Sequence, residues 1–137
     1  MINSINTAEQ TVAVNANVLF DTDRVRTRAC GVGGWVQHDA GSGAFEIVRQ
    51  GIYKIDFNAN VTAAAAGDTT LAIQNNGVTI GGTEMDYVVV VAGDFQNVSA
   101  STLVVVQPFG SRTISVANIS AAEVTVDDAN IIITRIA

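Results

Sequence analysis

The sequence predicts a single all-β domain, an antiparallel β-sandwich of about eight to ten strands with little helix. The chain of 137 residues has the length of one domain, so we assign residues 1–137 to one domain. Its β-branched residues, 20 Val, 13 Ile and 13 Thr against 3 Leu, suit a pleated sheet better than a helix. Short apolar runs separated by turn residues recur along the whole chain and favour the same fold class.

The first half of the chain contains five runs that predict strands. The clearest is 51–61, in which apolar Tyr53 and Phe57 occupy odd positions and polar Lys54 and Asn58 occupy even ones. A period of two places the apolar set on a core and the polar set on a wetter face. The other four runs are 11–20, 24–29, 34–39 and 44–48.

The second half contains the remaining predicted strands and the strongest turn signal. Asn76 and Gly77 stand between two β-branched runs in residues 70–80, and both tolerate the positive φ that a tight hairpin needs. The alanine-rich stretch at 63–67 is too short for a stable helix and is predicted to be a loop. The further strand-like runs are 87–92, 97–107, 112–118, 123–127 and 130–137.

Three predicted strands, at 87–91, 103–106 and 131–133, are apolar on both faces. In an antiparallel fold one face of a strand normally meets water, so the second apolar face needs a cover. We expect other subunits to supply it; the alternative is that both faces lie within one irregular core. The residues predicted to lie in a subunit interface or the core are Tyr53, Phe57, Val89, Val105, Ile132 and Ile136.

The charge balance excludes several classes of partner. With 7 basic and 13 acidic residues the net charge is −6, and we expect no nucleic-acid binding.

No apolar run approaches the roughly 18 residues of a membrane span, so we expect no membrane insertion. The N-terminal residues show no secretion signal, which predicts synthesis in a cytosol. The single cysteine, Cys30, is expected to pack as a small apolar side chain.

A series of short motifs begins after residue 39. A turn of small residues leads to Phe45, and Gly51 and Tyr53 then open the long alternating strand. The later motifs, in order, are Asn76–Gly77, the strand pair joined at Gly110, and the closing strand at 130–137. Together they resemble the jelly roll shared by tumour-necrosis-factor-like cytokines and complement-type globular heads. The resemblance implies an antiparallel jelly-roll sandwich that assembles as a homotrimer.

The sequence also departs from the pattern of that superfamily. Ile55 stands where an aromatic residue often follows the tyrosine, and Ser111 replaces the Asp that is usual after the hairpin glycine. The closing strand lacks the Phe-Ser-Gly often seen just before it. The chain therefore looks like a distant bacterial or bacteriophage member.

Few residues suggest catalysis or metal binding, and we expect no enzyme, cofactor or metal site. The only histidine, His38, stands beside Asp39 and is interpreted as a solvated turn residue rather than as the base of a Ser-His-Asp triad. Ser42 is one of the serines that would have to approach it. Calcium is the alternative for Asp21 and Asp23, but turn and cap roles explain such residues better.

One basic stripe and two aromatic residues remain as candidate contacts. Arg24, Arg26 and Arg28 alternate along a predicted strand and form either a solvated edge or a docking stripe for an acidic surface. Trp35 and Tyr87 would stack on a sugar ring if they were exposed, although core packing is the simpler interpretation.

The leading functional hypothesis is a non-enzymatic trimeric jelly roll that decorates a larger assembly. The absence of a collagen-like stalk and of a secretion signal favours a bacteriophage virion, as a head decoration or fibre component made in the host cytoplasm. The alternative is a trimeric glycan-binding adhesion module on a viral, bacterial-cell or spore surface, in which three weak sites gain avidity.

Overall fold

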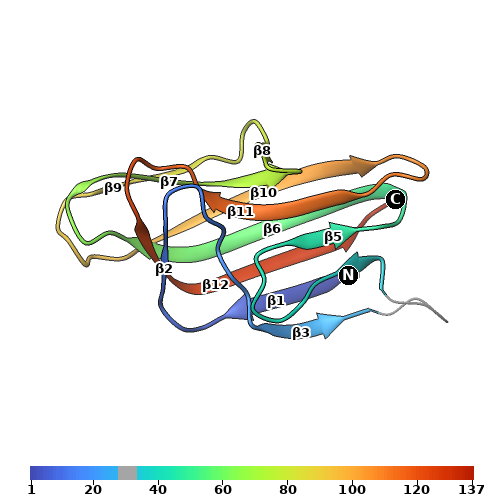
Figure 1. Ribbon diagram of the computed structural model, residues 1–137, viewed down its shortest axis with the longest axis horizontal. Coiled ribbons are helices and arrows are strands. Elements are labelled where there is room, and N and C mark those ends of the chain that lie inside the picture. The colour runs from blue at the N-terminus through green and yellow to red at the C-terminus, as the bar shows by residue number, and fades with distance from the viewer. Residues whose placement is uncertain (28–33) are drawn as a thin grey trace.

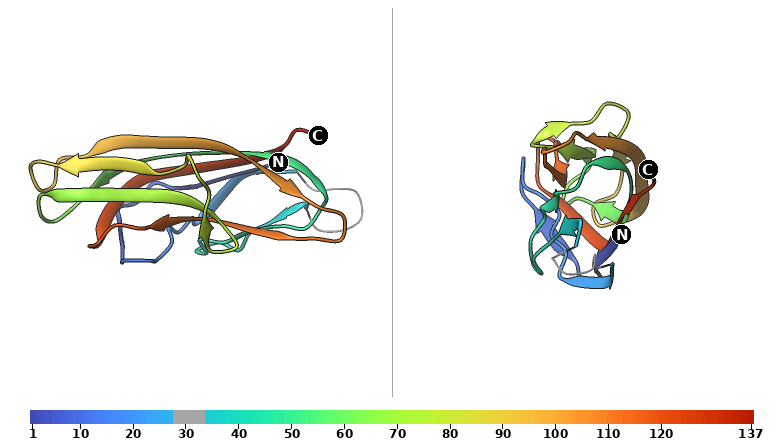
Figure 2. Two further views of the ribbon diagram at one scale, coloured as in Figure 1. Left: turned by 90° about the horizontal axis from the view of Figure 1, so that it is seen from above. Right: turned by 90° about the vertical axis from the view of Figure 1, so that its right-hand side faces the viewer.

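The computed structural model describes residues 1–27 and 34–137, which form two antiparallel sheets packed face to face (Figure 1). Most strands of both sheets run roughly along the long axis, and an end-on view shows them surrounding one interior (Figure 2). The described residues contain no helix. The predicted all-β antiparallel sandwich is therefore confirmed.

Each sheet contains six strands. Sheet A has the order β10 (Gln96–Val106), β6 (Gly51–Thr62), β12 (Val124–Arg135), β1 (Ile2–Asn6) and β3 (Thr22–Arg26), with β2 (Gln10–Val12) also paired to β12. Sheet B has the order β4 (Val36–Gln37), β5 (Phe45–Ile47), β11 (Arg112–Asn118), β7 (Gly67–Asn75) and β8 (Val78–Thr79), with β9 (Met85–Val89) also paired to β7.

The described chain contains twelve strands, more than the eight to ten that its turn signals predict. Four of the twelve, β2, β4, β5 and β8, are only two or three residues long. β1 lies in a segment, INSIN, whose polar content hides its strand character. Conversely, the runs at 123–127 and 130–137 are one strand, β12, with a register shift between Asp127 and Asn130 that accommodates positive φ at Asp128.

The predicted strand at 11–20 is wrong beyond Val12. β2 ends there, and the chain turns through Asn15, whose φ is 63°. Asparagine tolerates this left-handed conformation better than most residues, because its short side chain bonds locally to the backbone. Residues 17 and 20 then make isolated bridges to Ala117 and Ser42, so this segment runs along the edge of sheet B.

The core lies between the two sheets and follows the alternation predicted for β6. The odd-numbered residues of β6 from Tyr53 to Val61 are buried, whereas Lys54 is exposed. Phe20 packs edge-on against Phe45 and Phe57, with ring centroids 5.3 and 6.4 Å apart. Edge-to-face pairs of this kind add to the free energy gained by burying the rings. One contiguous hydrophobic core therefore joins both sheets.

The β7–β8 hairpin confirms the predicted turn and provides a test of it. Asn76 and Gly77 have φ values of 52° and 79°. Gly77→Ala is expected to destabilise the fold by about 1 kcal/mol, because a Cβ disfavours this conformation. A Cβ would meet no atom within 4 Å at Gly77 or at Gly81, and Gly81 does not have positive φ. Gly81→Ala is therefore the matched control, and equal urea-unfolding midpoints for the two variants would contradict the strain argument.

Candidate functional site

One end of the outer face of sheet A carries apolar side chains that no described segment covers. On β10, Val104 and Val106 point into the core and are at most 4 % exposed, whereas Leu103 and Val105 are 56 % and 51 % exposed. β10 is the edge strand of sheet A, and no described segment covers its outer face. The alternative that both apolar faces of this strand lie within one core is therefore wrong.

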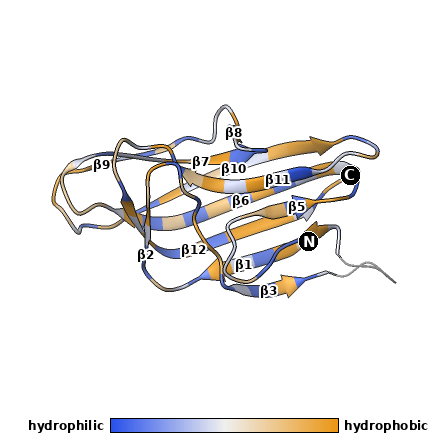
Figure 3. Ribbon diagram, in the orientation of Figure 1, coloured by the Kyte–Doolittle hydropathy of each residue, from blue (hydrophilic) through white to orange (hydrophobic). Residues whose placement is uncertain are grey.

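The exposed apolar residues of sheet A gather toward the end where both termini lie. Ile52 is the register partner of Val105, and the Ile136 amide donates to the Ile52 carbonyl at 2.8 Å. Figure 3 shows β10 as hydrophobic toward its C-terminal end, beside these residues. We call this surface the outer apolar patch; it consists of Ile52, Leu103, Val105, Ile132 and Ile136. The Lys54–Asp56 ion pair interrupts it, because Lys54 and Asp56 are the register partners of Leu103 and Ile132.

A row of asparagines occupies the middle of the same face. The Asn3 side-chain amide donates to Asn130 Oδ1 at 2.6 Å, and the Asn130 amide donates to Asn58 Oδ1 at 2.9 Å. The row crosses β1, β12 and β6, so its members satisfy one another across three strands. These amides can donate and accept further bonds, which suits a polar interface that remains partly hydrated.

The third predicted strand that is apolar on both faces, at 87–91, does not lie on sheet A. β9 belongs to sheet B and ends at Val89, so the predicted strand at 87–92 extends too far. Val89 is buried, but Val88, Val90 and Val91 are exposed at the end of the molecule opposite the termini (Figure 1). The sequence pattern grouped this run with those of β10 and β12, and the structure separates them.

The six residues predicted for core or interface divide into two groups. Tyr53, Phe57 and Val89 are core residues. Val105 and Ile136 are more than half exposed on the outer apolar patch, and Ile132 is half-buried there. The set was identified by apolar type alone, which does not distinguish the two faces of a strand.

The basic stripe is less regular than the alternation predicts. The pairing of β3 with β1 shifts register between Asp23 and Val25, which interrupts the alternation at Arg24. Arg26 lies 3.6 Å from the Asp23 carboxylate, so it is partly neutralised. Arg28, like Cys30, lies outside the described residues.

His38 is buried, so its interpretation as a solvated turn residue is wrong. Its Nδ1 lies 2.8 Å from Asp23 Oδ1, and its Nε2 lies 2.9 Å from the Ser42 carbonyl oxygen. The imidazole stacks on Phe45 with a centroid distance of 4.2 Å. Because the serine presents its carbonyl and not its hydroxyl, this group has the wrong geometry for a nucleophile and base. It joins the strand β3 of sheet A to the loop that follows β4 of sheet B.

The remaining candidates do not assemble into a reactive or metal-binding site in the described part of the chain. No three His, Cys, Asp or Glu side chains come together there as a metal site. Tyr87 is half-buried and packs against the core, and its hydroxyl donates to the Asp94 carbonyl at 3.3 Å. Trp35 is half-buried, and the guanidinium groups of Arg49 and Arg135 lie over its ring. No sequence motif predicted this cluster. The described residues include no helix that is long and apolar enough to cross a membrane.

The paired sheets and their strand order define a jelly-roll β-sandwich of the tumour-necrosis-factor and complement C1q type. Eiger, a TNF from S. frugiperda, matches with a TM-score of 0.72 and 12% identity over 99% of this chain and 92% of that one. The globular domain of zebrafish complement 1qA matches with a TM-score of 0.66 and 12% identity, over 96% and 94% of the two chains.

A phage protein shares the same fold. PRD1 vertex protein P5 matches with a TM-score of 0.52 and 15% identity, over 99% of this chain and 96% of that one. No family model and no curated protein matches the sequence. The resemblance noted in the sequence is therefore confirmed at the level of the fold.

Proposed function

We propose that the protein is a non-enzymatic homotrimeric jelly roll that forms part of a bacteriophage virion, as a head decoration or a fibre component. The observation that carries the proposal is the outer apolar patch, which the described chain exposes on a regular sheet. Apolar patches of this kind mark contacts with other chains. A homotrimer covers three copies of the patch at once, and the likeness to a phage vertex protein supports the virion setting.

The amide row gives this interface a polar part beside its apolar one. Asn3, Asn130 and Asn58 already bond in one direction across the sheet. Facing rows from neighbouring subunits would need matching donors and acceptors, which favours one register over others. The apolar patch would therefore supply most of the affinity, and the amide row would fix the alignment of the subunits.

The native mass is the first test of this function. Light scattering behind a sizing column is expected to give three times the 14.3 kDa chain mass, unchanged on dilution to low micromolar concentration. Purified particles of a phage that encodes the chain are then expected to contain it in stoichiometric amounts. A monomer in solution would remove the trimer, and absence from intact particles would remove the virion role.

A glycan-binding adhesion module is the second candidate, and a hollow on sheet B favours it. Neutral hydrogen-bonding side chains, including those of Asn15, Asn17, Gln74 and Asn76, line this hollow beside the β7–β8 hairpin. Amide groups of this kind can pair with sugar hydroxyls. A glycan array probed with the intact protein would separate the two functions, because the decoration role needs no sugar binding at this hollow.

A further inference from the structure

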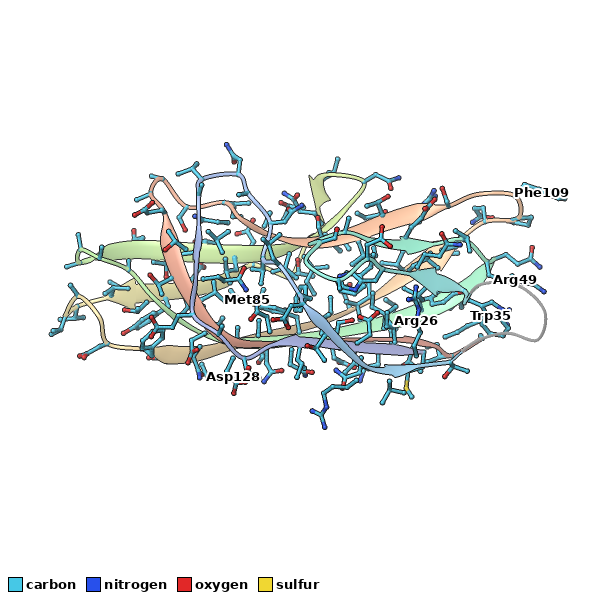
Figure 4. All side chains as sticks on the ribbon, turned by 60° about the horizontal axis from the view of Figure 1, so that its bottom comes forward. Arg26, Trp35, Arg49, Met85, Phe109 and Asp128 are labelled. Atoms are coloured by element: carbon cyan, nitrogen blue, oxygen red, sulfur yellow. The ribbon has the colours of Figure 1, made fainter. Side chains whose placement is uncertain are left out.

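Trp35, Arg49 and Arg135 form a cationic cluster at the end of the sandwich near the termini. The guanidinium carbons of Arg135 and Arg49 lie 4.6 and 5.9 Å from the centroid of the indole. Figure 4 shows Trp35 and Arg49 together at this end of the molecule. Trp35 precedes β4 of sheet B and Arg135 ends β12 of sheet A, so the cluster bridges the two sheets.

Two N–H donors in this cluster are buried without a partner. Arg135 Nε and Trp35 Nε1 have no hydrogen-bond acceptor among the residues that the structure describes. A buried donor without a partner costs free energy, about 1–3 kcal/mol for a neutral group and more for a charged one. Both donors therefore call for an acceptor that another group supplies.

Among the described residues, no acidic side chain makes a close ion pair with Arg49 or Arg135. In the described ranges, the three close ion pairs involve Asp23 or Asp56 and neither arginine of the cluster. Residues 28–33 contain no Asp or Glu, so they add no counter-charge by composition. Both guanidinium groups also act on Tyr53, where they oppose the rise in its pKa that burial causes.

The backbone beside the cluster is shaped to admit the Arg135 side chain. Gly51 has a φ of 148°, and a Cβ built there would lie 2.5 Å from Arg135 Nε. Arg135 is the register partner of Tyr53, whose hydroxyl donates to the Arg49 carbonyl at 2.9 Å. These contacts fix the main chain beside both arginines, so the fold itself holds Arg49 and Arg135 next to Trp35.

We propose that this cluster is a binding site for a carboxylate group. A guanidinium binds a carboxylate side-on through two parallel N–H bonds, and Arg135 Nε is one such donor that has no partner among the described residues. Trp35 Nε1 adds a further N–H, and Arg49 supplies the second positive charge. The carboxylate comes either from a free acid, such as an acidic sugar, or from an acidic side chain of a neighbouring subunit. A neighbouring subunit could reach the cluster because Arg135 is followed directly by Ile136 of the outer apolar patch.

The single tryptophan makes the test direct, because its emission reports only this cluster. The intact protein is titrated with sodium glucuronate, sodium glutarate and inorganic phosphate at constant ionic strength. We expect a saturable emission change with the carboxylates. In Arg135→Gln and Arg49→Gln the affinity is expected to fall about tenfold or more. Arg112→Gln is the control, because Arg112 bonds to the Ser111 carbonyl and lies on β11.

A second measurement covers the case in which a neighbouring subunit already fills the site. The emission titration would then be flat, and both cluster variants, but not Arg112→Gln, would lower the salt concentration at which the oligomer dissociates. Circular dichroism confirms that each variant is folded. A flat titration with unchanged oligomer stability, or saturation by phosphate alone, would overturn the proposal. The titration itself requires no trimer, so its result is separate from that of the proposed assembly.

Discussion

Val105→Asp is expected to convert the proposed trimer into a folded monomer. Val105 is 51 % exposed on the outer apolar patch, so the charge meets water in the isolated chain and leaves the core intact. In the trimer the same carboxylate would be buried in an apolar contact, three times over, at a cost of several kcal/mol. The dissociation concentration is expected to rise by more than about a hundredfold, measured by light scattering over a dilution series.

Val78→Asp is the matched control for this experiment. Val78 is 70 % exposed, but it lies in the β8 hairpin of sheet B, away from the patch. It is expected to leave the native mass unchanged. Ile132→Asp offers a second variant within the patch, where its side chain is half-buried. If Val105→Asp and Ile132→Asp both keep the native mass of the unmodified protein, the patch is not the subunit interface.

His38→Leu is expected to destabilise the fold by about 3 kcal/mol. Leucine replaces the imidazole by an apolar group of comparable size and removes both hydrogen bonds. The Asp23 carboxylate then loses its closest nitrogen partner, and the Ser42 carbonyl keeps only the Phe20 amide as a donor. The cost should appear as a lower urea midpoint with an unchanged m-value.

Gln37→Leu serves as the control, since Gln37 is the exposed neighbour of His38 and lies on β4. This substitution is expected to change the stability by less than about 0.5 kcal/mol. If His38→Leu were as stable as this control, the bridge from Asp23 to Ser42 would contribute nothing to holding the two sheets together.

The sequence predicted the fold where side-chain type alone carries the signal. β6 and β11 match their predicted runs to within one residue, because alternation or a dense β-branched run marks them from end to end. β1 was missed, since only its pairing on both sides with β12 and β3 stabilises so polar a segment. Tertiary pairing of this kind leaves no local pattern in the chain.

The candidate sites were less predictable for a similar reason. The apolar character of Leu103 and Val105 indicated a covered face, but only the strand order shows that β10 is an edge strand whose outer side is free. His38 looked like a turn residue because its partner, Asp23, is 15 residues away and on the other sheet. The cluster at Trp35 depends on residues 100 positions apart, so no spacing rule could have found it.

The position of β1 and β12 in sheet A has a consequence for how the chain folds. Ile2 is the register partner of Ile133, and β12 lies between β1 and β6. A ribosome delivers β1 before the other strands of this sheet and β12 after all of them. Sheet A therefore closes only after synthesis has passed β12, and folding must wait for contacts between residues far apart in the sequence, which slows it. Until then, β6 and β1 present unpaired edges to every other nascent chain.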